Sequence, residues 1–318
     1  MKFINRILKK DCLYFKISTI ILLYFFLLIF KKKEKLKIKN QRKKTYDTMK
    51  ICICTYGKKE NRYIREFVQH YEKYDVDKIY LYDNNDIKGE RFEDVIQDYI
   101  DKGFVKIINW RGIFKGLYKV LNECYQRNYK KYDWFIFYEL DEFIHLYNYT
   151  SIKSFLNEYR FKSCQLIYLN LVCHTDNNLL YYENKSLVER FPIIAKYKPE
   201  VKSILRGHIQ NIRINHIHQC TNKLINCNGF GHKNKIRNIF ATEPDYKYYY
   251  IDHYYSKSTE EFIIKLKRGD MYKYSKNYIM HKIHKYYLQS NFTKEKIELI
   301  ENRTGFNLSN YKNLLGFK

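Results

Sequence analysis

Apolar and polar stretches alternate along residues 51–138, and their lengths predict strands and helices in turn. Short, largely apolar runs at 51–56, 78–82, 104–108 and 134–138 are typical of buried strands. Between them, residues 64–71, 92–100 and 117–129 carry apolar side chains at helical spacing. Strands that are apolar on both faces and alternate with helices predict an α/β fold, in which helices cover a mostly parallel sheet.

Polar turn residues follow three of these strands. They are residues 57–61, the run Asp83–Asp86, and the acids Glu139, Asp141 and Glu142. In open α/β sheets, ligands bind outside the carboxyl ends of the strands, so these residues are expected to converge on one crevice. Alternation along an extended chain would place Glu139 and Asp141 on one side, with Leu140 turned away.

Two neighbouring carboxylates repel each other unless a cation lies between them, and Mg²⁺ or Mn²⁺ suits oxygen ligands of this kind. The acids therefore predict a divalent metal site that also holds the phosphates of a substrate. A solvated turn, or a cap of the next helix, is the alternative interpretation of the same three residues. The coincidence of polar residues at three strand ends favours the metal site.

The N-terminal region differs in composition from the rest of the chain. Residues 17–30 carry no charge, and residues 31–44 carry nine cations and one anion. A spanning helix needs roughly 20 apolar residues, which residues 12–30 supply if Lys16 reaches the membrane surface. We therefore expect a tail at 1–16, a membrane anchor at 12–30 and a basic linker at 31–48. A catalytic domain at 49–270 and a helical extension at 271–318 follow.

The orientation of this anchor stays open. Five cations precede the span and nine follow it, which by the positive-inside rule favours a cytosolic catalytic domain. A domain in the lumen of the endoplasmic reticulum or Golgi is the alternative. Acceptor sequences for N-glycosylation begin at five asparagines, but asparagine is so abundant that they hardly bear on the compartment. They are Asn148, Asn184, Asn291, Asn302 and Asn307.

Charge and cysteine content narrow the functional class only partly. The net charge of +25 suggests nucleic acid, acidic lipid or a phosphorylated ligand, although lysine is spread along the whole chain, as codon bias in an AT-rich genome would produce. Hydrophobic residues make up 45% of the chain, which excludes a disordered protein. The eight cysteines show no zinc-type spacing, and Cys52 and Cys54 are expected to be small buried residues.

Three segments resemble, in order, the family 92 glycosyltransferases. They are "CTYGKKENRYIREFVQHYEKYDVDKIYLYDNND", "WFIFYELDEFI" and "DHYYSKSTEEFIIKLKRG", and the resemblance covers roughly residues 49–270. It implies a GT-A fold, which is Rossmann-like. It also implies transfer of a sugar to a glycan, glycoprotein or glycolipid acceptor from a nucleotide sugar, for which a UDP-sugar is the first expectation. It also implies a metal cofactor, Mn²⁺ or Mg²⁺.

The resemblance further implies roles for particular residues. Thr55, Tyr56, Asp83 and Asn84 would bind the nucleoside of the donor. Glu139 and Asp141 would stand at the D-x-D motif of the family, with Glu139 replacing the usual aspartate. Asp141 would bind the metal, and Glu139 would approach either the ribose of the nucleotide sugar or the metal. That replacement keeps the charge and lengthens the side chain by one methylene, which puts the reach of this ligand in question.

Later segments resemble the family less closely. Lys202 and Arg206 would neutralise phosphate oxygens. His216 or His253 would complete the metal shell, with His218 behind them. Lys257 and Ser258 match the family in identity without a role that we can derive, and Arg268 with Gly269 is typical of a helix end.

Family 92 members are expected to invert the anomeric centre, which requires a carboxylate base for the acceptor hydroxyl. Asp176 and Glu183 are equal candidates and Glu189 is a third. Tyr181 and Tyr182 could stack on a sugar ring.

Two other functional classes compete with a transferase. A nucleic-acid-binding protein would use the basic, aromatic C-terminal segment, and its retention on nucleic acid would depend steeply on salt. A catalytically silent relative would bind nucleotide sugar, carbohydrate or a partner without turnover, as the replacement at Glu139 suggests. We expect the transferase and no nucleic acid partner.

Overall fold

The computed structural model describes residues 28, 31–32, 48–113, 116–195, 200–216, 219–220, 224–233, 246–269 and 276–308. The chain divides into two units, Met1–Met49 and Lys50–Lys318. Within the described ranges, no helix has both the length and the apolar character needed to cross a membrane. The predicted anchor at 12–30 and linker at 31–48 lie almost entirely outside these ranges and stay predictions.

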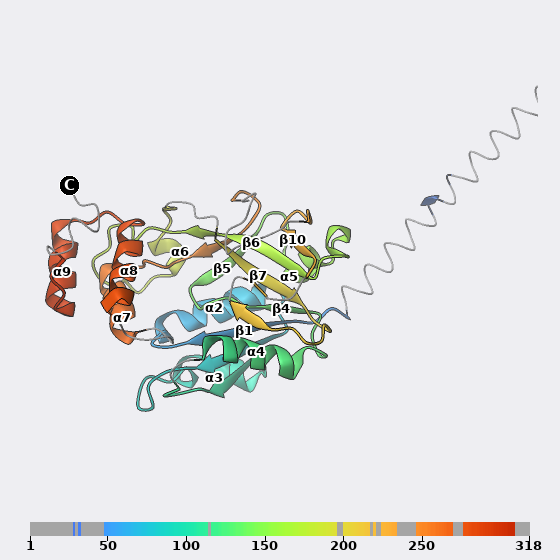
Figure 1. Ribbon diagram of the computed structural model, residues 1–318, viewed down its shortest axis with the longest axis horizontal. Helices are drawn as coiled ribbons and strands as arrows, with labels where there is room; N and C mark the ends of the chain where they lie inside the picture. Colours follow the sequence, from blue (N-terminus) through green and yellow to red (C-terminus); the bar gives the residue numbers. More distant parts are fainter. Residues whose placement is uncertain are drawn as a thin grey trace, which may run out of the picture. The chain divides into compact units, whose positions relative to one another are not determined.

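A mixed sheet organises the second unit, in the order β3-β2-β1-β4-β7-β6-β11-β5, with β10 paired to β6 (Figure 1). The strands at one end, β3-β2-β1-β4, are all parallel, and helices connect them along the chain. This order is that of nucleotide-binding α/β sheets. The bounds are β1 Ile51–Gly57, α2 Asn61–Lys73, β2 Lys78–Asp83, α3 Glu93–Asp101, β3 Val105–Asn109, α4 Leu117–Asn128 and β4 Trp134–Ile136.

The other half of the sheet mixes both directions. β7 runs antiparallel to β4 and β6, and β5 runs antiparallel to β11, while β11 and β10 are parallel to β6. Parallel pairings still outnumber antiparallel ones, so the predicted α/β, mostly parallel sheet is confirmed. The bounds are β5 Glu142–Leu146, α5 Ile152–Leu156, η1 Tyr159–Phe161, β6 Leu166–Cys173, α6 Leu187–Arg190, β7 Val201–Arg206, β10 Asn226–Asn228 and β11 Tyr249–His253; β8 Ile214–His216 and β9 Gln219–Cys220 pair separately.

Helices cover both faces of the parallel half. α4 packs Leu121 and Tyr125 on the face that carries Cys54 and Phe135. α2 packs on the other face, where the ring of Tyr71 lies 6.3 Å from that of Tyr138, just after β4. Because side chains of a strand point alternately to the two faces, a strand covered on both sides must be apolar throughout. The continuous apolar runs of the sequence have this origin.

Three C-terminal helices lie side by side at one end of the sheet, drawn in orange and red in Figure 1. They are α7 Thr259–Arg268, α8 Lys276–Tyr287 and α9 Lys294–Thr304. Phe262 of α7 stacks on Tyr286 of α8 with ring centroids 4.0 Å apart, and Ile300 of α9 is buried in the same cluster. The predicted division of the chain into a catalytic domain and a C-terminal extension at residue 270 stays a prediction.

Two disulfides tie distant segments together. Cys54 of β1 is bonded to Cys124 of α4, and Cys164 is bonded to Cys227 of β10. Cys52 is free and buried, as expected. Cys54 is also buried as expected, but it is bonded to Cys124, because its side chain meets α4, which the sequence alone does not place.

Candidate active site

Residues 139–142 form a tight turn between β4 and β5. The N–H of Glu142 donates to the carbonyl oxygen of Glu139 at 3.0 Å, and the N–H of Glu139 donates to Oε2 of Glu142 at 3.0 Å. Leu140 is buried, and a Cβ on Gly57 would lie 2.5 Å from its Cδ1. Leu140 therefore points away from the acids as expected, but because of a turn and not of an extended strand, since β4 ends earlier than predicted.

Glu139 is the accessible acid of the turn, with a side chain 33% exposed. The hydroxyl of Tyr56 donates to Oε1 at 2.7 Å, and Nζ of Lys202 lies 2.9 Å from Oε2. Burial by itself would raise the pKa of Glu139, but Lys202 holds this pKa well below its usual value. Glu139 is therefore an anion with one side open to solvent.

Asp141 is buried and surrounded by cations. Nζ of Lys257 lies 2.8 Å and Nζ of Lys265 lies 3.0 Å from Oδ2, while Nε2 of His253 lies 3.6 Å from Oδ1. Burial opposes its ionisation, yet the two lysines hold the pKa of Asp141 well below its usual value. Burial and the neighbouring cations lower the pKa of Lys265 to about 7. The carboxylate thus anchors two lysines beside the acidic turn.

Glu142 is fully buried at the start of β5. Its Oε1 lies 2.8 Å from Nζ of Lys202 and 3.9 Å from Nε2 of His253. Oε1 is therefore ion-paired with Lys202. Burial, with the nearby acids, raises the pKa of Glu142 to about 8, against the effect of Lys202. An additional cation at this atom would therefore be stabilising.

Glu139, Glu142 and His253 are placed to share a metal ion, because one donor atom of each lies within 4.8 Å of the other two. Burial lowers the pKa of His253 to about 4, so its imidazole is neutral and able to coordinate at neutral pH. Carboxylate oxygens suit Mg²⁺ and Mn²⁺, and the imidazole nitrogen favours a transition metal such as Mn²⁺. The donor set of two carboxylates and one imidazole fits the expected cofactor.

This grouping differs in part from the expected one. Glu142 occupies the position in the cluster that was expected for Asp141, because the turn directs Asp141 toward the two lysines. His253 lies in the cluster, as the resemblance implied. His216 ends β8, but its side chain lies outside the described residues, as does the whole of His218.

The residues expected to bind the nucleoside lie at the carboxyl ends of β1 and β2. Thr55 is buried with a hydroxyl that has no hydrogen-bond partner, and Tyr56 contacts Glu139 as described above. Asp83 is paired with Asn109 in the β2–β3 ladder, and its Oδ2 accepts from Nε of Arg111 at 2.7 Å. The N–H of Asn84 donates to the carbonyl oxygen of Gly57 at 2.9 Å, which joins the two strand ends.

Lys202 and Arg206, both expected at the phosphates, lie apart on β7. Lys202 is buried between Glu139 and Glu142, whose charges outweigh burial and raise its pKa above the usual value. Arg206 instead pairs with Trp134, at the opposite end of β4 from the acidic turn. Its guanidinium donates to the carbonyl oxygens of Cys164 and Phe161, each at 2.8 Å. The prediction for Arg206 is therefore wrong: its donors bind backbone.

None of the three base candidates contacts the acidic turn within the described residues. Asp176 is buried, where Oδ2 lies 2.5 Å from Nζ of Lys296 and accepts from the hydroxyl of Tyr286 at 2.6 Å. Glu183 is 42% exposed and pairs with a surface lysine, and Glu189 caps α6. A carboxylate enclosed like Asp176 has little room for an acceptor hydroxyl, so this arrangement favours a structural role.

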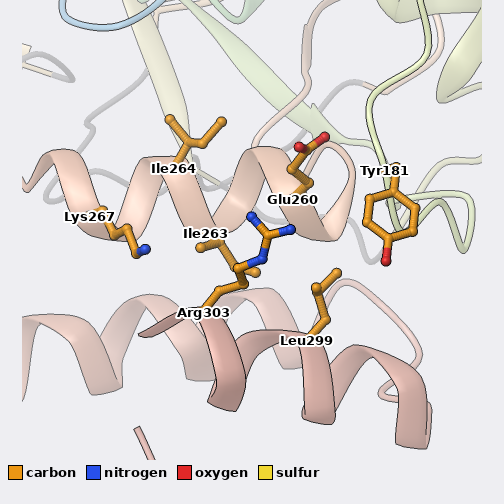
Figure 2. A pocket seen from close by; sticks show the side chains of 7 residues that line it. All are labelled: Tyr181, Glu260, Ile263, Ile264, Lys267, Leu299 and Arg303. Atoms are coloured by element: carbon orange, nitrogen blue, oxygen red, sulfur yellow. The ribbon is translucent and has the colours of Figure 1, made fainter. Parts of the chain in front are cut away.

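Tyr181 lines a small cavity of about 140 Å³ between α7 and α9 (Figure 2). Ile263, Ile264 and Lys267 of α7 form one wall, and Leu299 and Arg303 of α9 form the other. The volume is below that of usual ligand pockets, which hold some 300 Å³ or more. Tyr182 lies beneath Arg190, whose guanidinium carbon is 4.9 Å from its ring centroid. The contacts of the two tyrosines are with neighbouring protein elements.

α7 and its N-terminal cap make contacts that sequence reasoning missed. Ser258 caps the helix, Glu261 pairs with buried Arg190, Lys265 reaches Asp141, and Arg268 lies 2.9 Å from Glu60. Positions 258, 261, 265 and 268 recur at three- and four-residue intervals and so share one face of the helix. That spacing was the available signal, but the element that this face meets was not visible in the sequence.

Comparison with known proteins identifies the family of the chain. The sequence profile described as Glycosyltransferase family 92 matches residues 47–302. A glycosyltransferase family 92 protein of Ricinus communis is 25% identical over 126 residues, which are 39% of this chain and 22% of that protein. The match thus spans less than a quarter of the length of that relative.

Among solved structures, S. aureus TarS 1–349 in complex with UDP-GlcNAc is 13% identical, with a TM-score of 0.35 over 84% of this chain and 76% of that chain. A putative glucose-1-phosphate thymidylyltransferase of Bacillus anthracis, in complex with sucrose, is 13% identical, with a TM-score of 0.28 over 50% of this chain and 70% of that chain. Scores this low carry no weight, whereas the family profile covers most of the chain. The chain belongs to glycosyltransferase family 92.

Proposed function

We propose that the protein is a metal-dependent glycosyltransferase. It transfers a sugar from a nucleoside diphosphate sugar, a UDP-sugar in the first place, to a glycan or glycoconjugate acceptor with inversion. The observation that carries the proposal is the grouping of Glu139, Glu142 and His253 within 4.8 Å at the carboxyl end of β4. Family membership supports the reaction class.

Glu139, Glu142 and His253 would hold Mn²⁺ or Mg²⁺, and the ion, when bound, supplies positive charge to the donor diphosphate. The chain adds positive charge of its own. Lys257 and Lys265 contact Asp141 beside this group, and Lys202 lies between the two glutamates. Positive groups held in place before the reaction stabilise a leaving diphosphate without reorganisation.

In the transfer step, the acceptor oxygen bonds to the anomeric carbon while the bond from that carbon to the diphosphate oxygen breaks. The electron pair of the broken bond goes to the diphosphate, and the acceptor proton goes to a carboxylate base. Asp176 and Glu183 stay the candidates for this base. The structural role favoured for Asp176 makes it the weaker of these two candidates for the base. Thr55, Tyr56, Asp83 and Asn84 would contact the nucleoside.

We further propose that residues 12–30 anchor the protein in a membrane and that the catalytic domain lies in an oxidising lumen. The disulfides Cys54–Cys124 and Cys164–Cys227 support a lumenal domain, because disulfides persist in oxidising compartments and are rare in the cytosol. The distribution of cations around the anchor favours the opposite, cytosolic location. Acceptors in the lumen would be glycoproteins or glycolipids.

The test screens the full chain, purified in detergent, against UDP- and GDP-sugars with Mn²⁺, Mg²⁺ or a chelator. Nucleotide release is measured together with labelling of the acceptor. We expect the chelator to abolish turnover and Mn²⁺ to restore it. Glu142→Gln and His253→Ala should each lower turnover by roughly a hundredfold, as for the loss of charge-stabilising groups, whereas Glu298→Gln, at a glutamate that is 56% exposed on α9, should not.

Turnover that is unchanged by the chelator and in Glu142→Gln would refute the metal-dependent mechanism. Unchanged turnover in Asp141→Ala would remove Asp141 from it. Binding of a nucleotide sugar without turnover under any of these conditions would identify the silent relative. The position of Lys202, 2.9 Å from Glu139 and 2.8 Å from Glu142, favours that second function, because its ammonium group lies between the two carboxylates that would hold the metal.

A further inference from the structure

A second cleft, of about 700 Å³, opens at the end of β5. This volume falls within the usual range of ligand sites. Five of the residues that line it are aromatic, although aromatic residues make up only 18% of the chain. They are Tyr147, Tyr149, Phe230, Tyr248 and Tyr249.

The cleft is separate from the candidate active site. In the β5–β11 ladder, Glu142 pairs with His253 at one end and Leu146 pairs with Tyr249 at the other. Four residues of a strand span roughly 13 Å, at about 3.3 Å each. The buried pair Ile144 and Ile251 lies between the two sites. A ligand in the cleft would therefore occupy a surface distinct from the metal ligands.

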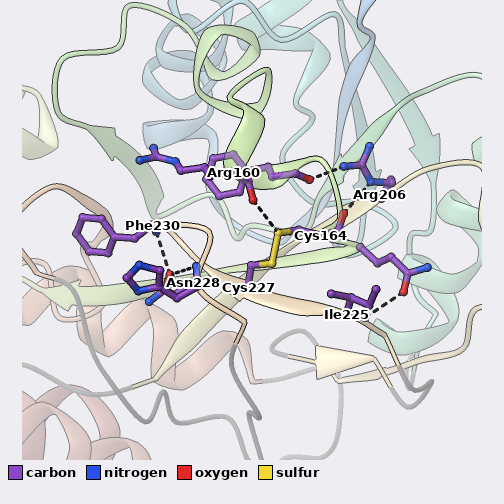
Figure 3. Close-up of a disulfide and its surroundings, with 10 residues drawn as sticks. Arg160, Cys164, Arg206, Ile225, Cys227, Asn228 and Phe230 are labelled. Carbon is purple, nitrogen blue, oxygen red and sulfur yellow. Dashed lines mark hydrogen bonds between the residues drawn. A yellow bond between two sulfur atoms is a disulfide. The ribbon is translucent and has the colours of Figure 1, made fainter.

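The segment that carries Phe230 is held rigidly (Figure 3). The side-chain oxygen of Asn228 accepts from the N–H groups of Phe230 and His232, each at 3.0 Å. The disulfide Cys164–Cys227 ties the preceding residue to the start of β6. Phe230 is thus presented by a braced turn.

The two glycines beside Phe230 permit close approach of neighbouring elements. A Cβ at Gly229 would lie 3.0 Å from the Cβ of Tyr249. A Cβ at Gly231, whose φ is +80°, would lie 2.7 Å from the Cβ of Arg160. Larger residues at either position would push Phe230 away from the cleft. The position of Phe230 in the wall of the cleft therefore depends on the two glycines as well as on the disulfide.

Arg160 packs against two of the lining rings. Its guanidinium carbon lies 4.9 Å from the ring centroid of Tyr249 and 5.9 Å from that of Tyr149. The ring of Tyr147, which is 50% exposed, meets that of Tyr248 edge-on with the centroids 5.5 Å apart. The rings nearest solvent are thus held in place before any ligand binds.

The polar groups of the cleft select among ligands. Asn148, in an exposed turn, offers an amide, and Glu158 offers a carboxylate. Lys247 and Arg160 lie 5.1 Å and 4.9 Å from the rings of Tyr248 and Tyr249, but among the described residues that line the cleft the charged group is the carboxylate of Glu158. A carboxylate in the lining disfavours a nucleic acid or phosphate. Flat apolar faces beside a few hydrogen-bonding groups match the alternating C–H and O–H groups of a neutral sugar.

We propose that this aromatic cleft is a second, non-catalytic carbohydrate site that holds a neutral oligosaccharide. The choice of carbohydrate over other uncharged ligands rests on the proposed function. The site itself rests on the geometry above. A glycan bound there would be retained near the active site, so that its effective concentration for transfer would rise.

The test measures binding of defined tetrasaccharides of β-linked galactose, glucose, N-acetylglucosamine and mannose to the full chain in detergent. Calorimetry and saturation-transfer NMR are carried out without nucleotide or added metal. All variants carry Thr150→Ala, which removes the N-glycosylation sequence of Asn148 but keeps its side chain. We expect at least one probe to bind at millimolar concentration.

Tyr147→Ala and Phe230→Ala should each weaken that binding about tenfold, the size of a lost aromatic contact. The matched control Tyr159→Ala removes a tyrosine that is 68% exposed and lies outside the cleft, and it should have no effect. Binding should persist in Glu142→Gln, so a failure of the proposed catalytic function leaves this proposal standing. The absence of binding by all four probes, or equal binding by wild type and Tyr147→Ala, would overturn it.

Discussion

Variants that break the buried ion pair between Asp176 and Lys296 can distinguish two roles for the carboxylate of Asp176. As a catalytic base, Asp176 would act on an acceptor, whereas as a structural group it attaches the loop after β6 to α9. The two roles predict different responses to Asp176→Asn, to Lys296→Met and to the two changes combined. The double variant is informative because it removes both charges at once.

Both side chains are 1% exposed, and their charged atoms lie 2.5 Å apart. Removing one member of a buried pair leaves an uncompensated charge, which costs about 3–5 kcal/mol of unfolding free energy. For a domain of this size such a loss lowers the melting temperature by roughly 10 °C. Replacing both members by neutral groups avoids that charge, so the double variant should recover at least about 2 kcal/mol relative to the sum of the single changes.

The assay follows thermal and urea unfolding of the four proteins and, in parallel, the rate of sugar transfer below the lowest melting temperature. In the structural case, transfer by the double variant approaches that of wild type. The catalytic case predicts the reverse: Asp176→Asn lowers the rate by roughly a hundredfold or more at unchanged stability. A lasting loss of rate in the double variant, with wild-type stability in Asp176→Asn, would refute the structural assignment.

Three further predictions concern other parts of the domain. The Cys54–Cys124 bond closes a 70-residue segment, so Cys124→Ser should lower the free energy of unfolding by about 4 kcal/mol in urea titrations, and full stability in reductant would contradict this. Burial lowers the pKa of His70 from 6.5 to about 4, so as pH falls the unfolded chain takes up a proton before the folded chain does. The melting temperature should therefore drop between pH 6.5 and about 4, and it should drop less in His70→Gln. Lys202→Met should abolish transfer, whereas Arg206→Met should lower the melting temperature and leave the rate of the folded protein intact; equal effects on the rate would contradict the different positions of these two side chains.

Local pattern was sufficient for the parallel half of the sheet. The apolar runs and helical spacings between residues 51 and 136 reflect contacts that every strand and helix of such a layer must make, so they are readable in a short window. The polar residues after β1, β2 and β4 were also readable, because the carboxyl ends of neighbouring parallel strands share one edge.

Contacts across long stretches of chain were decided only by the tertiary structure. Lys257 and Lys265 reach Asp141 across 116 and 124 positions, and Lys296 reaches Asp176 across 120. Each of these pairings depends on how α7 and α9 dock on the sheet, which no periodicity within either helix specifies.

The same limit applies to the acidic turn. The sequence by itself determined that three acids follow a buried strand and that the family is that of sugar transferases. Which acid points toward His253 and which toward the lysines depended on the hydrogen bonds that close the turn and on the packing of Leu140 against Gly57. When a strand ends one residue earlier or later, every side chain that follows points in a different direction. The set of metal ligands is therefore a property of the folded chain.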